Sequence, residues 1–359
     1  MKVKSTIKSA ISRLNYPYRL IRNRILNRVE PVIVVLVVNN KCNLKCRYCF
    51  GQYYNRREYQ DFTTEELIDI IDQLYVLGTR LLTIHGGEAL LRNDIGQIVD
   101  HVKRKNIYIN LITNGLLLKE KVDLIKDVDS LCISLDGRKK GHDANRGKGT
   151  FEPTLEAIEF AKREGFRLRV HATITKYTMN DVEFLAKLAK EIGYFQEFSI
   201  LYQCGGVSKH FKEFMLSDEE TKSVIREIIK WKKRGYPIYT AYRVLNNALN
   251  WPYPYTKPHL TFQEIPSDFK PIPCFYGRIK FTLDADGYLY PCFALMDEFK
   301  ALNVKEVGVE KAIEHVRNTN RCASCIHFTN NDHNLLLGLS MPQFLNQCRL
   351  QLKELLRIY

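Results

Sequence analysis

The sequence has no long hydrophobic run. Its longest apolar stretch, residues 31–38, covers eight residues, far short of the roughly 20 that a membrane-spanning helix needs. The first 30 residues contain no uninterrupted apolar region and no small-residue cleavage site, so they do not resemble a secretory signal. We therefore expect a cytoplasmic protein in which no segment spans a membrane.

Acidic residues are fewer than basic residues, and half of the difference lies in the first 30 residues. The 359 residues include 40 Asp or Glu against 54 Lys or Arg, which gives a net charge of +14. Residues 1–30 contribute +7 of this, because eight basic residues stand there beside a single acid, Glu30. The remaining excess is small for a chain of this length, so the composition does not favour a nucleic-acid-binding protein.

Residues 1–30 are expected to form a basic amphipathic arm. Apolar residues recur at helical spacing on both sides of Pro17, which breaks the pattern into two short pieces. Such an arm packs on the main body with a solvated basic face, or it makes peripheral contact with an anionic membrane or an acidic partner. The sequence leaves these alternatives open.

From residue 32 onwards, predicted strands and helices alternate. A β-branched run predicts the first strand, and Thr63-Thr64-Glu65-Glu66 predicts a capping box for a helix that ends at Gly78. The six predicted strands are 32–38, 80–85, 108–113, 130–135, 167–175 and 198–202. This alternation predicts an α/β fold, a partial (β/α)6 barrel of parallel strands with its active site at the carboxyl ends of the strands.

Three cysteines follow the first predicted strand. Cys42, Cys46 and Cys49 have the spacing C-x3-C-x2-C, and in a reducing compartment clustered cysteines favour metal binding over disulfides. Three thiolates on one loop can hold three irons of a four-iron cluster and leave the fourth iron open to a ligand. Zinc is the weaker alternative, because no fourth ligand lies nearby.

This spacing, with Tyr48 before the last cysteine, resembles the signature of the radical S-adenosylmethionine (SAM) superfamily. The resemblance covers about residues 31–202. It implies a 4Fe-4S cluster whose open iron binds SAM. It also implies reductive cleavage of SAM to methionine and a 5′-deoxyadenosyl radical, which abstracts a hydrogen atom from a substrate C–H bond.

Motifs at the ends of later strands agree with this resemblance. Gly86-Gly87-Glu88 matches the family motif whose carboxylate receives the methionyl ammonium, although Ala89 replaces the frequent proline. Asn114, in Thr113-Asn114-Gly115, is either a further cofactor contact or part of an ordinary turn.

Ser134 and Arg146 resemble residues that hold the ribose and the carboxylate of the cofactor, and Asp136 belongs to the same motif as Ser134. Arg146 is alternatively a surface salt-bridge residue. The cofactor-binding residues that the resemblance implies are Tyr48, Gly86, Gly87, Glu88, Asn114, Ser134, Asp136 and Arg146.

Four cysteines in the last third of the chain form a second group: Cys274, Cys292, Cys322 and Cys325. Residues 280–290 predict a hairpin with Asp286-Gly287 at its turn, which brings the first two cysteines together, and the C-x2-C pair completes a four-ligand cage. Taken alone, such a cage suits zinc or an iron–sulfur cluster.

Behind a radical SAM domain, the four cysteines resemble a SPASM domain in its shortened, twitch form. Asn331 and Leu335 stand where the full pattern has two more cysteines. The resemblance therefore implies one auxiliary 4Fe-4S cluster, fully ligated and suited to electron transfer.

These assignments divide the chain into five parts. They are the arm (1–30), the partial barrel (31–205), a helical and Pro/aromatic linker (206–267), the SPASM/twitch-like domain (268–335) and a C-terminal helix (336–359). Cys132 is expected in the core. Cys204 and Cys348 are also candidates for the core, and Cys204 lies close enough to the expected site for a role there to be the alternative. His327 and His333 are expected to face solvent, with a role as a replacement metal ligand as the alternative.

The resemblance predicts an oxidoreductase that passes the electron of a substrate radical to the auxiliary cluster and takes electrons from a low-potential donor such as flavodoxin or ferredoxin. A small-molecule, sugar or lipid-linked substrate is favoured, because only about 30 residues precede the barrel and peptide maturases often carry a separate recognition domain there. A peptide maturase and a non-catalytic iron–sulfur protein are the alternatives. No catalytic acid or base can be named from the sequence.

Overall fold

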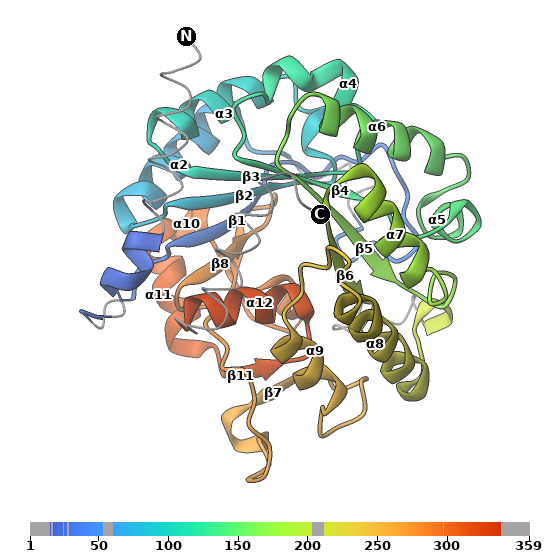
Figure 1. The fold of residues 1–359 in the computed structure, drawn as a ribbon. Coiled ribbons are helices and arrows are strands. Elements are labelled where there is room, and N and C mark those ends of the chain that lie inside the picture. Colours follow the sequence, from blue (N-terminus) through green and yellow to red (C-terminus); the bar gives the residue numbers. More distant parts are fainter. Residues whose placement is uncertain are drawn as a thin grey trace. The chain divides into compact units, whose positions relative to one another are not determined.

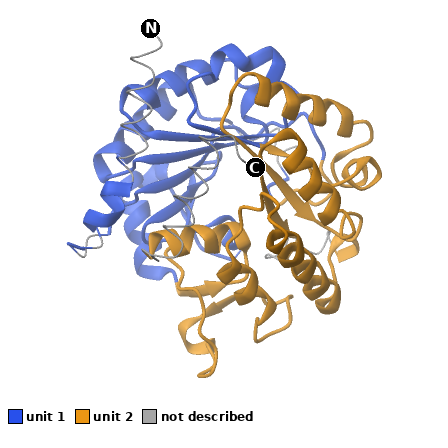
Figure 2. Ribbon diagram, viewed as in Figure 1, with its two compact units in different colours: residues 1–45, 51–132, 276–320 blue, residues 46–50, 133–275, 321–359 orange. Residues whose placement is uncertain are grey.

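The computed structural model describes residues 15, 17–23, 25–26, 29–52, 60–202, 212–296 and 298–338 (Figure 1). Cys204, Cys348 and most of the arm and the C-terminal segment lie outside the described residues. The chain forms two compact units (Figure 2): residues 1–45, 51–132 and 276–320, and residues 46–50, 133–275 and 321–359. The five predicted parts of the chain remain a prediction.

The first unit is built on a mostly parallel sheet. Its strands are β1 (Ile33–Val37), β2 (Leu81–His85), β3 (Tyr108–Thr113), β8 (Lys280–Leu283), β9 (Tyr288–Tyr290) and β10 (Leu302–Asn303). β1 pairs in parallel with both β2 and β8, and β2 with β3, while β9 runs antiparallel to β8 and β10. The predicted hairpin therefore forms, and its first strand extends the parallel sheet. β1 is buried along its whole length, as its β-branched run predicts.

The helices of the first unit are α2 (Thr64–Leu77), η2 (Ala89–Leu91), α3 (Ile95–Arg104), α4 (Leu118–Lys121), η3 (Val122–Leu124), η6 (Phe293–Leu295), α10 (Val304–Val307) and α11 (Val309–Thr319). α2 begins with the predicted capping box. The Thr63 hydroxyl accepts from the Glu66 amide at 3.1 Å, and the Glu66 carboxylate accepts from the Thr63 amide at 2.8 Å. The helix ends at Gly78, whose φ of 116° favours glycine.

β4 (Ser130–Ser134) carries the chain from the first unit to the second. The second unit contains β5 (Leu168–Ile174), β6 (Phe195–Ile200), β7 (His259–Thr261), β11 (Cys322–Cys325), α5 (Lys139–Arg146), α6 (Phe151–Arg163), α7 (Val182–Ile192), α8 (Asp218–Lys233), α9 (Tyr242–Leu249), η5 (Phe262–Glu264) and α12 (Phe328–Leu337). β5 and β6 are parallel, and β7 and β11 form a separate antiparallel pair. β6 begins three residues before the predicted strand.

Two parts of the second unit differ from the sequence-based expectation. α5 was not predicted, because its buried residues are Gly141, His142 and Asn145 and hydrophobic periodicity cannot reveal such a helix. The Pro/aromatic stretch is packed structure that contains α9 and β7. Two of its aromatic residues are buried and hydrogen-bonded: Trp251 Nε1 donates to the Lys257 carbonyl at 2.9 Å, and the Tyr255 hydroxyl donates to the Ala248 carbonyl at 2.7 Å.

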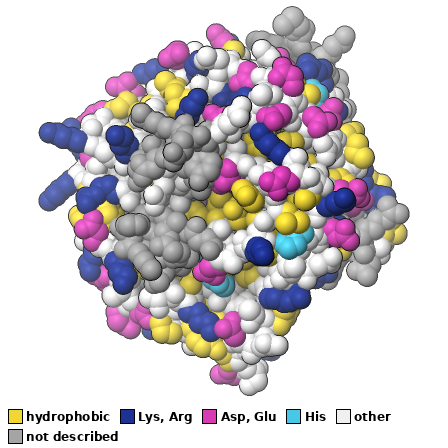
Figure 3. All heavy atoms as spheres, turned by 180° about the vertical axis from the view of Figure 1, so that it is seen from behind, with side chains coloured by type: hydrophobic (Ala, Val, Ile, Leu, Met, Phe, Trp, Pro, Cys, Tyr) yellow, Lys and Arg dark blue, Asp and Glu magenta, His cyan; other side chains and the backbone are white. Residues whose placement is uncertain are grey.

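Basic and acidic side chains are mixed on the surface, as expected from a composition rich in both. On the face in Figure 3, Lys and Arg side chains are interspersed with Asp and Glu. Arg19 and Arg22 of the arm both pair with Glu30, at 3.0 and 3.4 Å. In the part of the chain that the structure describes, no helix is long and apolar enough to cross a membrane.

The capping box of α2 gives a direct test of this local structure. Thr63→Ala removes the hydroxyl that caps the Glu66 amide, so we expect the free energy of unfolding to fall by about 1 kcal/mol. Denaturant unfolding measures the loss. Thr63→Ser keeps the hydroxyl and should stay close to the parent; an equal loss in both variants would show that the cap is not the cause.

Candidate active site

The three cysteines of the first group lie on the loop that follows β1, with Cys42 in the first unit and Cys46 and Cys49 in the second. Within the described residues, none of them is in a disulfide. Burial raises the pKa of Cys46 to about 11, although the charge of Arg146 opposes the shift. A buried thiol of this kind ionises when a cation binds it, so the donor chemistry fits an iron cluster.

Glu88 organises the strand ends of the first unit. Its buried carboxylate accepts hydrogen bonds from the Thr113 hydroxyl at 2.8 Å, the Asn114 amide at 2.8 Å and the Leu90 amide at 3.1 Å. Burial raises the pKa of Glu88, and these three hydrogen bonds limit the rise. The motifs that follow β2 and β3 therefore meet at one carboxylate.

Two asparagine side chains connect Glu88 and Asn114 to the loop after β1. Asn39 Nδ2 donates to the Glu88 backbone carbonyl at 2.9 Å, and Asn114 Nδ2 donates to Asn43 Oδ1 at 2.7 Å. A Cβ at Gly86 would lie 2.3 Å from Asn39 Oδ1, so only glycine fits there. Asn39 and Asn43 were not predicted, because their role arises from contacts between distant parts of the sequence.

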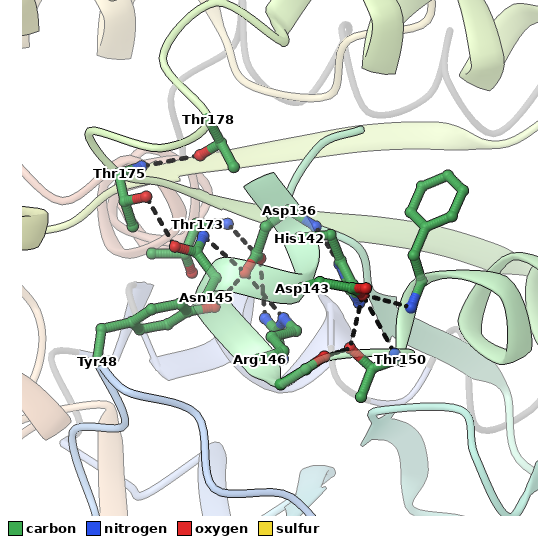
Figure 4. Close-up of polar contacts among 12 residues, drawn as sticks. Tyr48, Asp136, His142, Asp143, Asn145, Arg146, Thr150, Thr173, Thr175 and Thr178 are labelled. Atoms are coloured by element: carbon green, nitrogen blue, oxygen red, sulfur yellow. Dashed lines mark hydrogen bonds and ion pairs between the residues drawn. The ribbon is translucent and has the colours of Figure 1, made fainter. Parts of the chain in front are cut away.

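A second carboxylate, Asp136, organises the second unit (Figure 4). It is fully buried and receives five hydrogen bonds: Nε and Nη2 of Arg146, both at 2.9 Å, the Tyr48 hydroxyl at 2.6 Å, the Asn145 amide at 3.1 Å and the Thr173 backbone amide at 3.1 Å. The structure thus brings together three of the predicted cofactor residues, Tyr48, Asp136 and Arg146.

The electrostatics of this network keep the ion pair charged. Burial opposes ionisation of Asp136, but the charge and hydrogen bonds of Arg146, with the Tyr48 hydroxyl, hold the pKa of the carboxyl below its usual value. Burial likewise lowers the pKa of Arg146, but the nearby negative charge of Asp136 outweighs burial and raises the pKa of Arg146 above its usual value. Arg146 is a salt-bridge residue, as one alternative held, but its side chain is only 10% exposed and the pair is not on the surface.

The neighbours of Asp136 on α5 were missed by the sequence analysis. His142 Nδ1 accepts from the Asp136 amide at 3.2 Å, and Asn145 Oδ1 accepts from the Thr175 hydroxyl at 2.9 Å. The Asn145 carbonyl also accepts from the Arg47 amide at 3.0 Å. Burial lowers the pKa of His142 to about 4, so its ring is neutral. Asn145 therefore joins the cysteine loop, Asp136 and the end of β5.

β5 and β6 share a row of polar side chains that the sequence analysis also missed. Arg169 pairs with Glu197 at 2.6 Å, and His171 Nε2 lies 2.9 Å from the Ser199 hydroxyl, which lies 3.2 Å from the Thr329 hydroxyl of α12. Burial lowers the pKa of His171 and favours the neutral imidazole. Alternate polar residues at 169, 171 and 173 were the available signal, since strand residues two apart share a face.

The remaining cofactor residue, Ser134, is the half-buried last residue of β4 and takes no part in the Asp136 network of the described residues. Four of the others lie together in the first unit and three in the second. The first set is Gly86, Gly87, Glu88 and Asn114, and the second is Tyr48, Asp136 and Arg146.

Three cysteines of the second group are close in the second unit. The Cys274 amide donates to the Ala323 carbonyl at 2.8 Å, which places it against the strand that begins at Cys322 and ends at Cys325. Cys292 is buried in the first unit. The described residues contain no three His, Cys, Asp or Glu side chains that converge on a single metal ion. Cluster ligands need no such convergence, because each binds a different iron.

The residues after Cys325 correct one expectation. His327 does not face solvent: its Nε2 is buried, its ring packs edge-on against Tyr202 with centroids 4.9 Å apart, and burial lowers its pKa to about 4. The reason is that α12 packs against β6 and covers it. Asn331 and Leu335 are buried core residues, and Cys132 is buried as predicted.

Part of the chain is similar to a known protein family. Residues 36–189 match the family model described as the Radical SAM superfamily. The chain is 28% identical over 235 residues to the Fe-coproporphyrin III synthase of Methanosarcina barkeri, covering 63% of this chain and 58% of that protein. It is 25% identical over 315 residues to the mycofactocin maturase MftC of Mycolicibacterium smegmatis, covering 83% and 76%. The chain thus spans little more than half the length of the first of these relatives.

Solved structures share the fold. Streptococcus suis SuiB bound to S-adenosylmethionine aligns with a TM-score of 0.63 at 16% identity, covering 82% of this chain and 70% of that one. The anSMEcpe structure with bound AdoMet aligns with a TM-score of 0.58 at 19% identity, covering 80% and 82%. The predicted α/β fold is confirmed by these likenesses, and the cysteine loop and the strand-end motifs Gly86-Gly87-Glu88 and Thr113-Asn114-Gly115 fall inside the matched domain. Residues 36–189 of the chain are therefore similar to a radical SAM domain.

Proposed function

We propose that this chain reductively cleaves SAM and uses the resulting radical to abstract a hydrogen atom from a substrate C–H bond. The observation that carries the proposal is the buried Asp136 network, which ties Tyr48 of the cysteine loop to Arg146 and to β5 within the domain that matches the family. An iron–sulfur protein without catalytic function would not require this network beside its cysteines.

Cys42, Cys46 and Cys49 would hold the 4Fe-4S cluster. When bound, the cluster and SAM supply the 5′-deoxyadenosyl radical. Arg146 uses Nε and Nη2 for Asp136, and a guanidinium has five N–H donors, so others remain for an anionic group such as the methionyl carboxylate. The carboxylate of Asp136 already accepts five hydrogen bonds, which makes it a positioning residue for Tyr48 and Arg146.

Cys274, Cys292, Cys322 and Cys325 would hold one auxiliary 4Fe-4S cluster, in keeping with the SPASM/twitch resemblance. When bound, this cluster would accept the electron that remains on the substrate after hydrogen-atom abstraction, and a base would take the proton. His171 is the candidate base, because its neutral imidazole is anchored through Nε2 and shares β5 with Thr173. A low-potential donor such as flavodoxin or ferredoxin would supply the electron for SAM cleavage.

The substrate we favour is a small molecule, a sugar or a lipid-linked compound. Relatives named as a Fe-coproporphyrin III synthase and a heme synthase support a non-peptide substrate. A peptide is the second candidate, because SuiB bound to its precursor peptide SuiA aligns over 85% of this chain with a TM-score of 0.64. The arm remains a candidate for peripheral membrane contact, although Arg19 and Arg22 already pair with Glu30.

SAM cleavage tests the proposed function. The reconstituted, reduced protein should form 5′-deoxyadenosine from SAM under anaerobic conditions. Cys42→Ala, Cys46→Ala and Cys49→Ala should each abolish it, because each removes an iron ligand. Cys132→Ala, which removes a buried cysteine elsewhere, is the matched control and should keep the activity. Chromatography of the nucleoside measures the outcome; activity in Cys46→Ala equal to the parent would refute the proposal.

The buried ion pair gives a second prediction. Asp136→Asn leaves Arg146 buried without its anion, so we expect the free energy of unfolding to drop by about 3–5 kcal/mol. Replacing both partners, with Asp136→Leu and Arg146→Met, should recover part of this stability but not SAM binding. Denaturant unfolding and calorimetric SAM titration separate the two effects. Full stability of Asp136→Asn would show that the pair is not a structural anchor.

The class of substrate can be tested by comparing small-molecule and peptide fractions of a cell extract. Substrate binding often accelerates formation of 5′-deoxyadenosine, so the small-molecule fraction of a cell extract should stimulate it and the peptide fraction should not. A Cys42→Ala sample receives the same fractions as control. Stimulation by the peptide fraction alone would favour the second candidate.

A further inference from the structure

Helix α12 carries two buried asparagines directly after the Cys322–Cys325 strand. Asn331 is 0% exposed and Asn334 is 1% exposed. A buried amide without hydrogen-bond partners costs about 1–3 kcal/mol, so the partners of these two side chains show what the fold uses them for.

Asn331 is directed at Cys325. Its Nδ2 donates to the Cys325 carbonyl at 2.6 Å, and its Oδ1 lies 4.0 Å from Cys325 Sγ. Asn334 continues the chain of contacts: its Nδ2 donates to Asn331 Oδ1 at 3.3 Å, and its Oδ1 accepts from the Phe275 backbone amide at 2.9 Å. The two side chains therefore join Cys325 to the residue that follows Cys274.

Two further hydrogen bonds join the same two segments. The Cys274 amide donates to the Ala323 carbonyl at 2.8 Å, and the Ser324 hydroxyl donates to the Ile272 carbonyl at 2.9 Å. Residues 272–275 and 322–325 are thus joined by several hydrogen bonds of the protein itself. Fixing metal ligands before binding lowers the entropic cost of ordering them when the metal arrives.

We propose that Asn331 and Asn334 are positioning residues that hold Cys274 and Cys325 ready for the auxiliary cluster. This inference rests on the proposed function of the four cysteines. It also gives a role to Asn331, which stands where the full cysteine pattern has a further ligand: a neutral amide there keeps Cys325 in place and does not compete with it for iron.

The experiment uses the full chain with Cys42, Cys46 and Cys49 all replaced by Ala, so that any iron belongs to the second group. Asn331→Ala and Asn334→Ala are the test variants. Asn250→Ala is the matched control, because Asn250 is exposed at the end of α9. The first readout is the iodoacetamide alkylation rate of each cysteine in the metal-free protein, followed by peptide mass spectrometry.

Asn331→Ala should accelerate alkylation of Cys325 by about fivefold or more, the local opening expected when one buried hydrogen bond is lost. Asn334→Ala keeps the Asn331 contact to the Cys325 carbonyl, so it should accelerate Cys274 more than Cys325. Buried Cys132 reports global opening and should stay unchanged. The second readout is iron loss to a chelator after reconstitution, which should be faster in both variants and unchanged in Asn250→Ala.

The outcomes separate the inference from the function on which it rests. Parent-like alkylation and iron loss in both variants would overturn the inference alone, as would acceleration that Cys132 shares. Absence of iron from the reconstituted triple-alanine parent would overturn the auxiliary cluster and the inference with it.

Discussion

The buried ion pair of Asp136 and Arg146 is the interaction on which the arrangement of the cysteine loop, α5 and β5 in the second unit depends. Removing two charges from water costs several kcal/mol for each ion, and the pair persists because Asp136 receives five hydrogen bonds. The donors come from the cysteine loop, from α5 and from β5. The carboxylate therefore fixes Tyr48 and Arg146 in place, and its loss would release three elements together.

Glu88 has the same function in the first unit, where it fixes the residues that follow β2 and β3. In each unit, a buried carboxylate accepts most of its possible hydrogen bonds from donors of the protein: three for Glu88 and five for Asp136. These hydrogen bonds explain how the two carboxylates can be buried, because each accepts donors from several segments of its own unit.

Local patterns predicted most of the fold. The β-branched run of β1, the capping box at Thr63 and the turn at Gly287 depend on neighbouring residues, so the sequence alone reveals them. The cysteines and Glu88 were identified from their resemblance to a family signature. Asn39, Asn145 and His171 were not, because their roles come from partners far along the chain: Asn39 contacts residue 88, and Thr175 contacts Asn145. His327 was misplaced because only the packing of α12 on β6 buries it.

Asn331 stands where the full pattern has a cysteine, and replacing it by cysteine would remove buried hydrogen bonds. Asn331 accepts from Asn334 and donates to the Cys325 carbonyl. A cysteine at 331 is a weak hydrogen-bond partner, so it would leave the buried Asn334 amide without its acceptor and the Cys325 carbonyl without its donor. Leu335 is also buried, so a cysteine there would leave a cavity in the core. Asn331 and Leu335 thus have structural roles in α12, and cysteines at both positions would require α12 to be repacked.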